Sequence, residues 1–161
     1  GIIGILLMLA AFNLVYALVS APAGDLSDRI GRRSVIIGGW VVYGLIYLGF
    51  ALAQAPWHVW ALYITYGLYY GLAYGTAKAM VADLVQPEVR GTAYGTYNAM
   101  LGLIDFPASL IAGLLWQGVG SWDGFGPGAP FIFGSTLAFL AAGLLFLWKP
   151  ETHFKEPSAS P

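Results

Sequence analysis

Five long apolar runs dominate this sequence of 161 residues. They cover residues of about 1–22, 34–53, 57–85, 89–118 and 131–148. A helix that crosses the hydrocarbon core of a bilayer needs about 20 residues, so each run is long enough to span it. Only 9% of the residues are charged, whereas about 25% are charged in a soluble domain. The sequence therefore predicts an all-α fold, a five-helix polytopic membrane bundle over residues 1–150 with a polar tail over residues 151–161.

Composition and motifs argue against several classes of function. The chain has no cysteine, which excludes disulfides and thiolate metal sites. It lacks the sequence patterns of serine hydrolases, zinc proteases and phosphate-binding loops, and its two histidines are predicted near opposite membrane faces. No basic patch of the kind that binds nucleic acid is present. We therefore expect no enzyme activity, no cofactor or metal and no nucleic-acid partner, and we expect membrane lipids as the surroundings.

A short charged stretch separates the first two apolar runs. It reads Gly24-Asp25-Leu26-Ser27-Asp28-Arg29-Ile30-Gly31-Arg32-Arg33. The two glycines permit a tight reversal of the chain, and the serine and second aspartate can cap the next helix. The three arginines favour water and the anionic cytoplasmic leaflet. The stretch is predicted to be a loop, either one that only sets topology or one with a further function.

Positive charge is distributed unevenly between the two predicted membrane faces. One face holds Arg29, Arg32, Arg33, Arg90, Lys149 and Lys155. The loops predicted on the other face, residues 54–57 and 118–130, contain no lysine or arginine. Because cytoplasmic loops carry an excess of positive charge, we expect the charged stretch and the C-terminus to be cytoplasmic.

Polar residues recur at helical spacing within three of the apolar runs. The candidate cavity-lining residues in these stripes are Asn13, Tyr16, Tyr66, Tyr70, Tyr74, Lys78, Asn98 and Asp105. An ionisable group within a span is costly unless it faces a cavity or a partner, so Asp105 and Lys78 are the sharpest candidates. The stripes predict a shared aqueous or substrate cavity. The alternative is ordinary hydrogen bonding and packing between helices.

Small residues form a second pattern on the third and fourth runs. Gly67, Gly71 and Gly75 repeat every four residues, and Gly91, Gly95, Ala99 and Gly102 form a small-residue face on the next run. Such faces allow two helices to approach closely in a membrane. We expect these glycines to mark helix contacts.

Four segments resemble the major facilitator superfamily of secondary transporters. The charged stretch resembles its signature loop, which joins helices two and three and, in degenerate form, helices eight and nine. Residues 83–93 resemble the segment between helices ten and eleven of bacterial members, and residues 107–113 resemble helix eleven. Pro150-Glu151-Thr152 resembles the segment just after helix twelve. The resemblance implies helices eight to twelve. Helices two to six are the alternative, although the third run has Lys78 but no arginine, whereas helix four of many members has an arginine.

The resemblance also implies a function and partners. The chain would be part of a longer protein that transports a small-molecule substrate by alternating access, with helix seven and the N-terminal half as its missing partners. Helices eight, ten and eleven would line the cavity, and nine and twelve would brace it. The implied gating residues are Gly24, Asp28, Arg29, Gly31, Arg32 and Arg33.

The sequence also bears on the location of the protein, its coupling ion and an alternative function. The resemblance places the protein in a membrane, with a bacterial inner membrane as the expected location. The coupling ion is open, and the proton is one candidate. The alternative function is a self-contained small membrane scaffold or an oligomeric channel.

Overall fold

The computed structural model describes residues 1–148, and every regular element in that range is a helix. The α-helices are α1 (Ile2–Ile30), α2 (Arg32–Ala51), α3 (Pro56–Tyr69), α4 (Gly75–Asp83), α5 (Arg90–Gln117) and α6 (Ala129–Leu147). A π-helical segment, η1 (Tyr70–Tyr74), joins α3 to α4, and a short 3₁₀ turn, η2 (Pro87–Val89), precedes α5. The predicted all-α fold is confirmed. The predicted polar tail over residues 151–161 lies outside the described residues.

Four helical segments of the described chain are long and apolar enough to cross a membrane. They are Ile2–Ile30, Arg32–Ala51, Pro87–Gln117 and Ala129–Leu147. The third apolar run also forms a continuous helical path, from α3 through η1 to α4. Within η1 the backbone hydrogen bonds follow the π-helical pattern, which joins residues five positions apart instead of four. This segment divides the run into two shorter α-helices.

The first helix is longer than the sequence predicted, and the expected loop over residues 24–33 is wrong. Helix α1 continues through Pro22 and Gly24, so Asp28 and Arg29 also lie on it. Burial explains why the helix does not stop, because Ala23 and Ser27 are only 2% and 1% exposed. Packing of this last part of α1 on the bundle offsets the hydrogen bond that an interior proline removes.

The chain reverses at a single residue between α1 and α2. Gly31 has φ +89°, a conformation that favours glycine. Ser27 does not cap α2 as expected, because its hydroxyl donates to the carbonyl of Gly24 within α1 at 2.8 Å. The reversal is therefore tighter and later than the glycine pair suggested.

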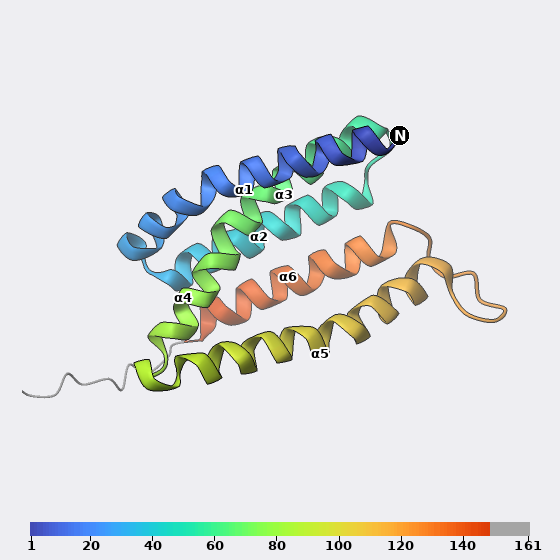
Figure 1. Ribbon diagram of the computed structural model, residues 1–161. Coiled ribbons are helices and arrows are strands. Elements are labelled where there is room, and N and C mark those ends of the chain that lie inside the picture. The colour runs from blue at the N-terminus through green and yellow to red at the C-terminus, as the bar shows by residue number, and fades with distance from the viewer. Residues whose placement is uncertain (149–161) are drawn as a thin grey trace, which may run out of the picture.

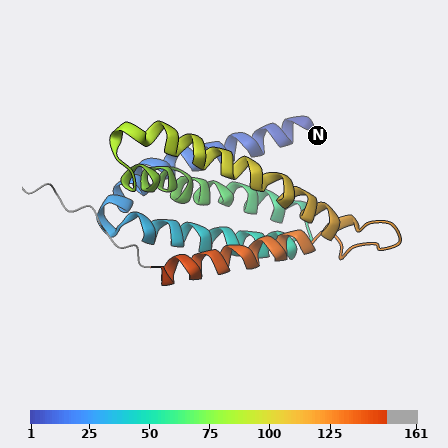
Figure 2. The ribbon, with the colours of Figure 1, turned by 90° about the horizontal axis from the view of Figure 1, so that it is seen from below.

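Helices α1, α2, α6 and α5 lie side by side from top to bottom in Figure 1, and α4 crosses toward the start of α5. Figure 2 shows the α1–α2 reversal and the α4–α5 turn at one end of the bundle, and the α5–α6 loop at the other. Helix α2 packs along α6, where the Ser135 hydroxyl donates to the carbonyl of Gly44 at 2.8 Å. Helix α5 contacts α4 and α6 but has no buried residue.

Candidate functional site

A dense cluster of tyrosines lies where α2 faces α3 and η1. The rings of Tyr43 and Tyr47 stack with centroids 4.0 Å apart, and those of Tyr66 and Tyr69 stack at 5.5 Å. Tyr43 also meets Tyr69 at 4.9 Å, and Tyr66 meets Tyr70 edge-on at 5.2 Å. Spacings of three and four residues place these side chains on one face of each helix. The cluster therefore fixes the orientation of several aromatic rings around one another.

A cleft of about 750 Å³ lies against this cluster. Residues of α2, α3, η1, α5 and α6, including Pro130 at the start of α6, surround it. They are Trp40, Tyr43, Tyr47, Tyr66, Tyr69, Tyr70, Asp105, Ala108, Ser109, Ala112, Pro130, Phe133, Gly134, Leu137, Ala138 and Ala141. Its volume lies within the range of about 300–1,000 Å³ that is typical of small-molecule sites. We call this space the tyrosine cleft.

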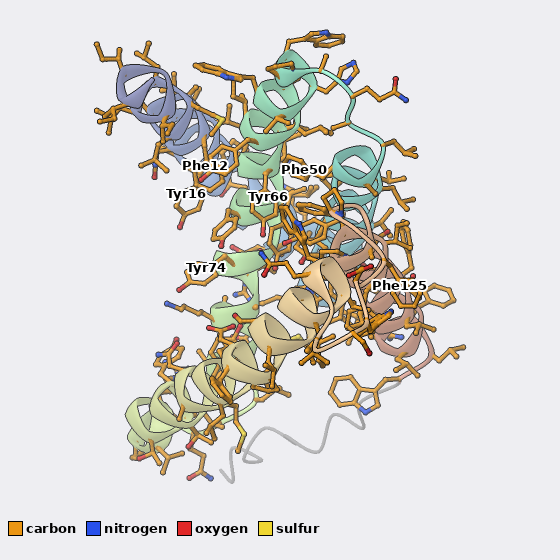
Figure 3. The ribbon with its side chains drawn as sticks, turned by 90° about the vertical axis from the view of Figure 1, so that its right-hand side faces the viewer. Phe12, Tyr16, Phe50, Tyr66, Tyr74 and Phe125 are labelled. Carbon is orange, nitrogen blue, oxygen red and sulfur yellow. The ribbon has the colours of Figure 1, made fainter. Side chains whose placement is uncertain are left out.

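The tyrosine cleft brings together Tyr66, Tyr70 and Asp105, which the sequence singled out as cavity-lining residues. Tyr66 lies on α3, Tyr70 lies on η1, and Asp105 lies on α5 beside Ser109. Figure 3 shows Tyr66 near the centre of the molecule, where α3 approaches the other helices. Among the described lining residues, Asp105 is the only one with a charged side chain.

Other predicted cavity residues lie outside the tyrosine cleft. The amide of Asn13 is exposed on α1 and donates to the carbonyl of Leu9 at 2.8 Å. Tyr16, also on α1, meets the ring of Tyr70 edge-on at 6.0 Å but is not among the lining residues. In Figure 3, Tyr16 lies to the left of Tyr66 and farther from α6. Helix α1 thus touches the tyrosine cluster without lining the cleft.

Three more predicted residues lie toward α4 or on the outer part of α5. The Lys78 ammonium lies 4.6 Å from the centre of the Tyr74 ring, a cation–π distance. Tyr74 stacks on Tyr70 at 5.8 Å, which links this pair to the tyrosine cluster. Asn98 is exposed on α5 and is not among the residues that line the cleft.

Helices α2 and α6, which were expected only to brace the bundle, contribute to the cleft. Trp40, Tyr43 and Tyr47 of α2 were not predicted as site residues, although the two tyrosines have the same four-residue spacing as the predicted stripes. They were missed because this run has no charged residue that would indicate a cavity. The four-residue spacing of Tyr43 and Tyr47 is the sequence pattern that could have identified them.

A charged cluster joins three helices at the end of the bundle that carries the α1–α2 reversal. The Arg32 guanidinium pairs with Asp28 of α1 at 2.9 Å and with Asp83 at the end of α4. It also donates to the Ser27 hydroxyl at 3.0 Å. All three charged side chains keep solvent contact, with exposures of 28% for Arg32, 64% for Asp28 and 54% for Asp83. The cluster therefore links α1, α2 and α4 through ion pairs that remain partly hydrated.

The neighbouring arginines have different contacts. Arg33 donates to the backbone carbonyls of Leu145 and Phe146, with a distance of 2.8 Å to Leu145. A cation at a helix C-terminus complements both the free carbonyls and the helix dipole. Arg29 lies in the last turn of α1 and is exposed. Arg33 thus links the start of α2 to the end of α6.

No cluster of three or more residues of metal-binding type occurs within residues 1–148.

Comparisons with known proteins agree on one family. The family model described as Major Facilitator Superfamily matches residues 2–161. An uncharacterized MFS-type transporter of Methanocaldococcus jannaschii is 42% identical over 137 residues, which are 85% of this chain and 32% of that protein. Multidrug resistance protein 2 of Bacillus subtilis is 32% identical over 84% of this chain and 32% of its own length. Tetracycline resistance protein, class B, of Escherichia coli is 27% identical over 90% of this chain and 34% of its own length. The chain spans about a third of the length of these relatives.

Proposed function

Because the chain belongs to the Major Facilitator Superfamily, we propose that it supplies helices eight to twelve of a secondary active transporter. The sequence resemblances over residues 83–93 and 107–113 support this assignment to the C-terminal half. Helix seven and the N-terminal half would then be its partners within the same protein. The proposed activity is movement of a small solute by alternating access, in which two halves rock around a central site.

The observation that carries this proposal is the tyrosine cleft. It combines an exposed carboxylate with several tyrosines in a cleft between apolar helices, at a size suited to a small molecule. A charged group within a span usually marks a substrate path, an ion path or a proton relay. Asp105 is therefore the residue that we assign to substrate binding or to proton coupling. Tyr66 and Tyr70 are proposed to contact the solute.

The charged cluster suits a gate at one face of the membrane. Partly exposed ion pairs contribute only about 0–1 kcal/mol each, so Arg32 can separate from Asp28 and Asp83 without a large cost. We propose that this end is cytoplasmic and that the cluster, with Gly31 as the turning point, favours closure of that side. Gly24 and Arg29 would act through the end of α1, and Arg33 through its contact with α6.

Transport by the full-length protein in proteoliposomes tests the proposal. A panel of solutes is presented under an imposed pH gradient, and uptake is compared among the wild type, Asp105→Asn and Asp123→Asn. We expect wild-type accumulation of one solute class, loss of gradient-driven accumulation in Asp105→Asn, and no loss in Asp123→Asn. Asp123 is a suitable control because it is an exposed carboxylate in the α5–α6 loop.

Two results of this experiment would contradict the proposal. Equal accumulation by the wild type and Asp105→Asn would show that the charge of Asp105 is not needed for substrate binding or proton coupling. Failure of correctly inserted wild-type protein to accumulate any solute of the panel would argue against secondary transport itself.

A further inference from the structure

We propose that the tyrosine cleft binds an organic monocation with aromatic or bulky apolar substituents. This inference rests on the proposed function, because it names the substrate class of the same site. Three features of the cleft support it: the one carboxylate among its described lining residues, its aromatic side chains and its small residues.

The charge of the cleft selects a cation. Among the described residues that line the cleft, Asp105 alone is charged, and none is a lysine or an arginine. The amine of Lys78 instead lies against the ring of Tyr74, and neither residue lines the cleft. Electrostatic attraction is stronger in a medium of low dielectric constant than in water. A cationic ligand therefore gains from Asp105, whereas an anionic ligand is repelled.

The aromatic wall favours an organic cation over a metal ion. The electron-rich faces of tyrosine and tryptophan rings attract ammonium and related cations, an interaction worth about 0.5–2 kcal/mol per ring. Stacking holds Tyr43 against Tyr47 and Tyr66 against Tyr69, which limits the freedom that the rings would lose on binding. A bare hard cation such as calcium requires about six to eight oxygen ligands, whereas the wall is mainly aromatic carbon.

Small residues leave space for a bulky ligand. Half of the lining residues from α5 and α6 are alanine or glycine, namely Ala108, Ala112, Gly134, Ala138 and Ala141. Phe133 and Leu137 of α6 add larger apolar side chains to the lining. The cleft of about 750 Å³ therefore offers mainly aromatic and apolar surface near Asp105. This composition predicts that the aromatic groups of the ligand lie against the tyrosine rings and the apolar residues of α6.

Equilibrium binding to the purified full-length protein in detergent tests this inference. Radiolabelled tetraphenylphosphonium is the probe, and tetraphenylborate is the competitor, because the two ions have nearly the same shape and opposite charge. We expect the phosphonium to bind and the borate to compete poorly. Asp105→Asn should weaken phosphonium binding at least tenfold, equivalent to about 1.4 kcal/mol. Asp123→Asn should leave it unchanged.

A second pair of variants separates the aromatic contribution from the charge. Tyr66→Phe keeps the ring and should bind phosphonium within about twofold of the wild type. Tyr66→Leu removes the ring and should weaken binding several-fold. Thermal melting of each variant in detergent verifies that it is folded before binding is compared.

Three outcomes would overturn the substrate assignment. They are no phosphonium binding by folded wild-type protein, equal binding of the two ions, and wild-type affinity in Asp105→Asn. None of them bears on alternating access, which is tested by labelling from the two sides of the membrane. A failure of the cation assignment is thus distinguishable from a failure of the proposed transport function.

Discussion

The contact between α1 and the α3–η1 segment depends on two glycines whose replacement has a calculable consequence. A Cβ atom at Gly67 would lie 2.7 Å from the carbonyl oxygen of Phe12 and 3.0 Å from the Cβ of Val15. A Cβ atom at Gly71 would lie 2.6 Å from Cγ1 of Val19. Ordinary van der Waals contacts of a Cβ begin near 3.4 Å. Alanine at either position therefore forces the two helices apart by several tenths of an ångström.

The expected loss of stability combines two opposing effects. Overpacking of a tight contact costs about 1–3 kcal/mol. Replacing glycine by alanine within a helix gains up to about 1 kcal/mol from helix propensity. We therefore expect Gly67→Ala and Gly71→Ala each to lower the free energy of unfolding by roughly 1–2 kcal/mol. The backbone carbonyl of Phe12 cannot rotate away from the new methyl group. The destabilisation caused by Gly67→Ala should therefore depend less on side-chain rearrangement than that caused by Gly71→Ala, where the methyl group meets the side chain of Val19.

Gly75 supplies a matched control on the same path. It continues the four-residue glycine repeat, but a Cβ atom there would have no neighbour within 4 Å. Gly75→Ala should be neutral or stabilising by up to about 1 kcal/mol. The assay is unfolding of the full-length protein in mixed micelles with increasing sodium dodecyl sulfate, followed by intrinsic fluorescence. Equal stability of the three variants would refute the close contact between α1 and this helical path.

Three other predictions concern the end of the bundle at which α1 and α2 meet, and its orientation. Arg33→Gln removes the cation from the C-terminus of α6 and should lower stability in the same unfolding assay by about 1–2 kcal/mol; stability equal to that of the wild type would show that these contacts are dispensable. Arg32→Ala and Asp83→Asn should each increase the labelling, from the cytoplasmic side, of cysteines placed in the transport path. The double variant should show little further increase, because both substitutions break the same cluster. Strictly additive effects would contradict a shared gate. A cysteine at Ser121 should react with an impermeant maleimide from outside intact cells and a cysteine at Asp25 should not, and the reverse pattern would overturn the proposed topology.

Local sequence patterns predicted the parts of the fold that depend on composition and spacing. The apolar runs predicted the helices because their length and hydropathy leave few other structures available in a bilayer. The spacing of Gly67 and Gly71 predicted a close helix contact, and the structure supplies α1 as the partner. The same expectation is wrong for Gly75, Gly91, Gly95 and Gly102 among the described residues, because a Cβ atom at each would have no neighbour within 4 Å. Pro22 and Gly24 misled the prediction, because their effect on the helix depends on packing that is remote in sequence.

Contacts between distant segments were beyond the reach of local patterns. Asp83 lies 51 positions after Arg32, and nothing in either segment identifies the other as its partner. Arg33 meets a carbonyl 112 positions away, at the end of α6. Such pairs depend on how the helices assemble.

The candidate site was predicted only in part, because its lining also depends on how the helices assemble. Helical spacing identified Tyr66, Tyr70 and Asp105, which share the tyrosine cleft. Periodicity shows which residues share a face of one helix, but it does not give the rotation of that helix toward its neighbours. The rotation of α1 places Asn13 away from the cleft, and that of α2 turns Tyr43 into it.

Cysteine accessibility at Ser109 tests alternating access most directly. Ser109 lines the tyrosine cleft beside Asp105 and is exposed there, and the chain has no cysteine of its own. In a cysteine-free full-length background, the rate at which Ser109→Cys reacts with an impermeant thiol reagent is measured from each side of the membrane. We expect reaction from both sides, and we expect Arg32→Ala to raise the cytoplasmic rate while lowering the external one. Reaction from one side only, unchanged by Arg32→Ala, would contradict alternating access.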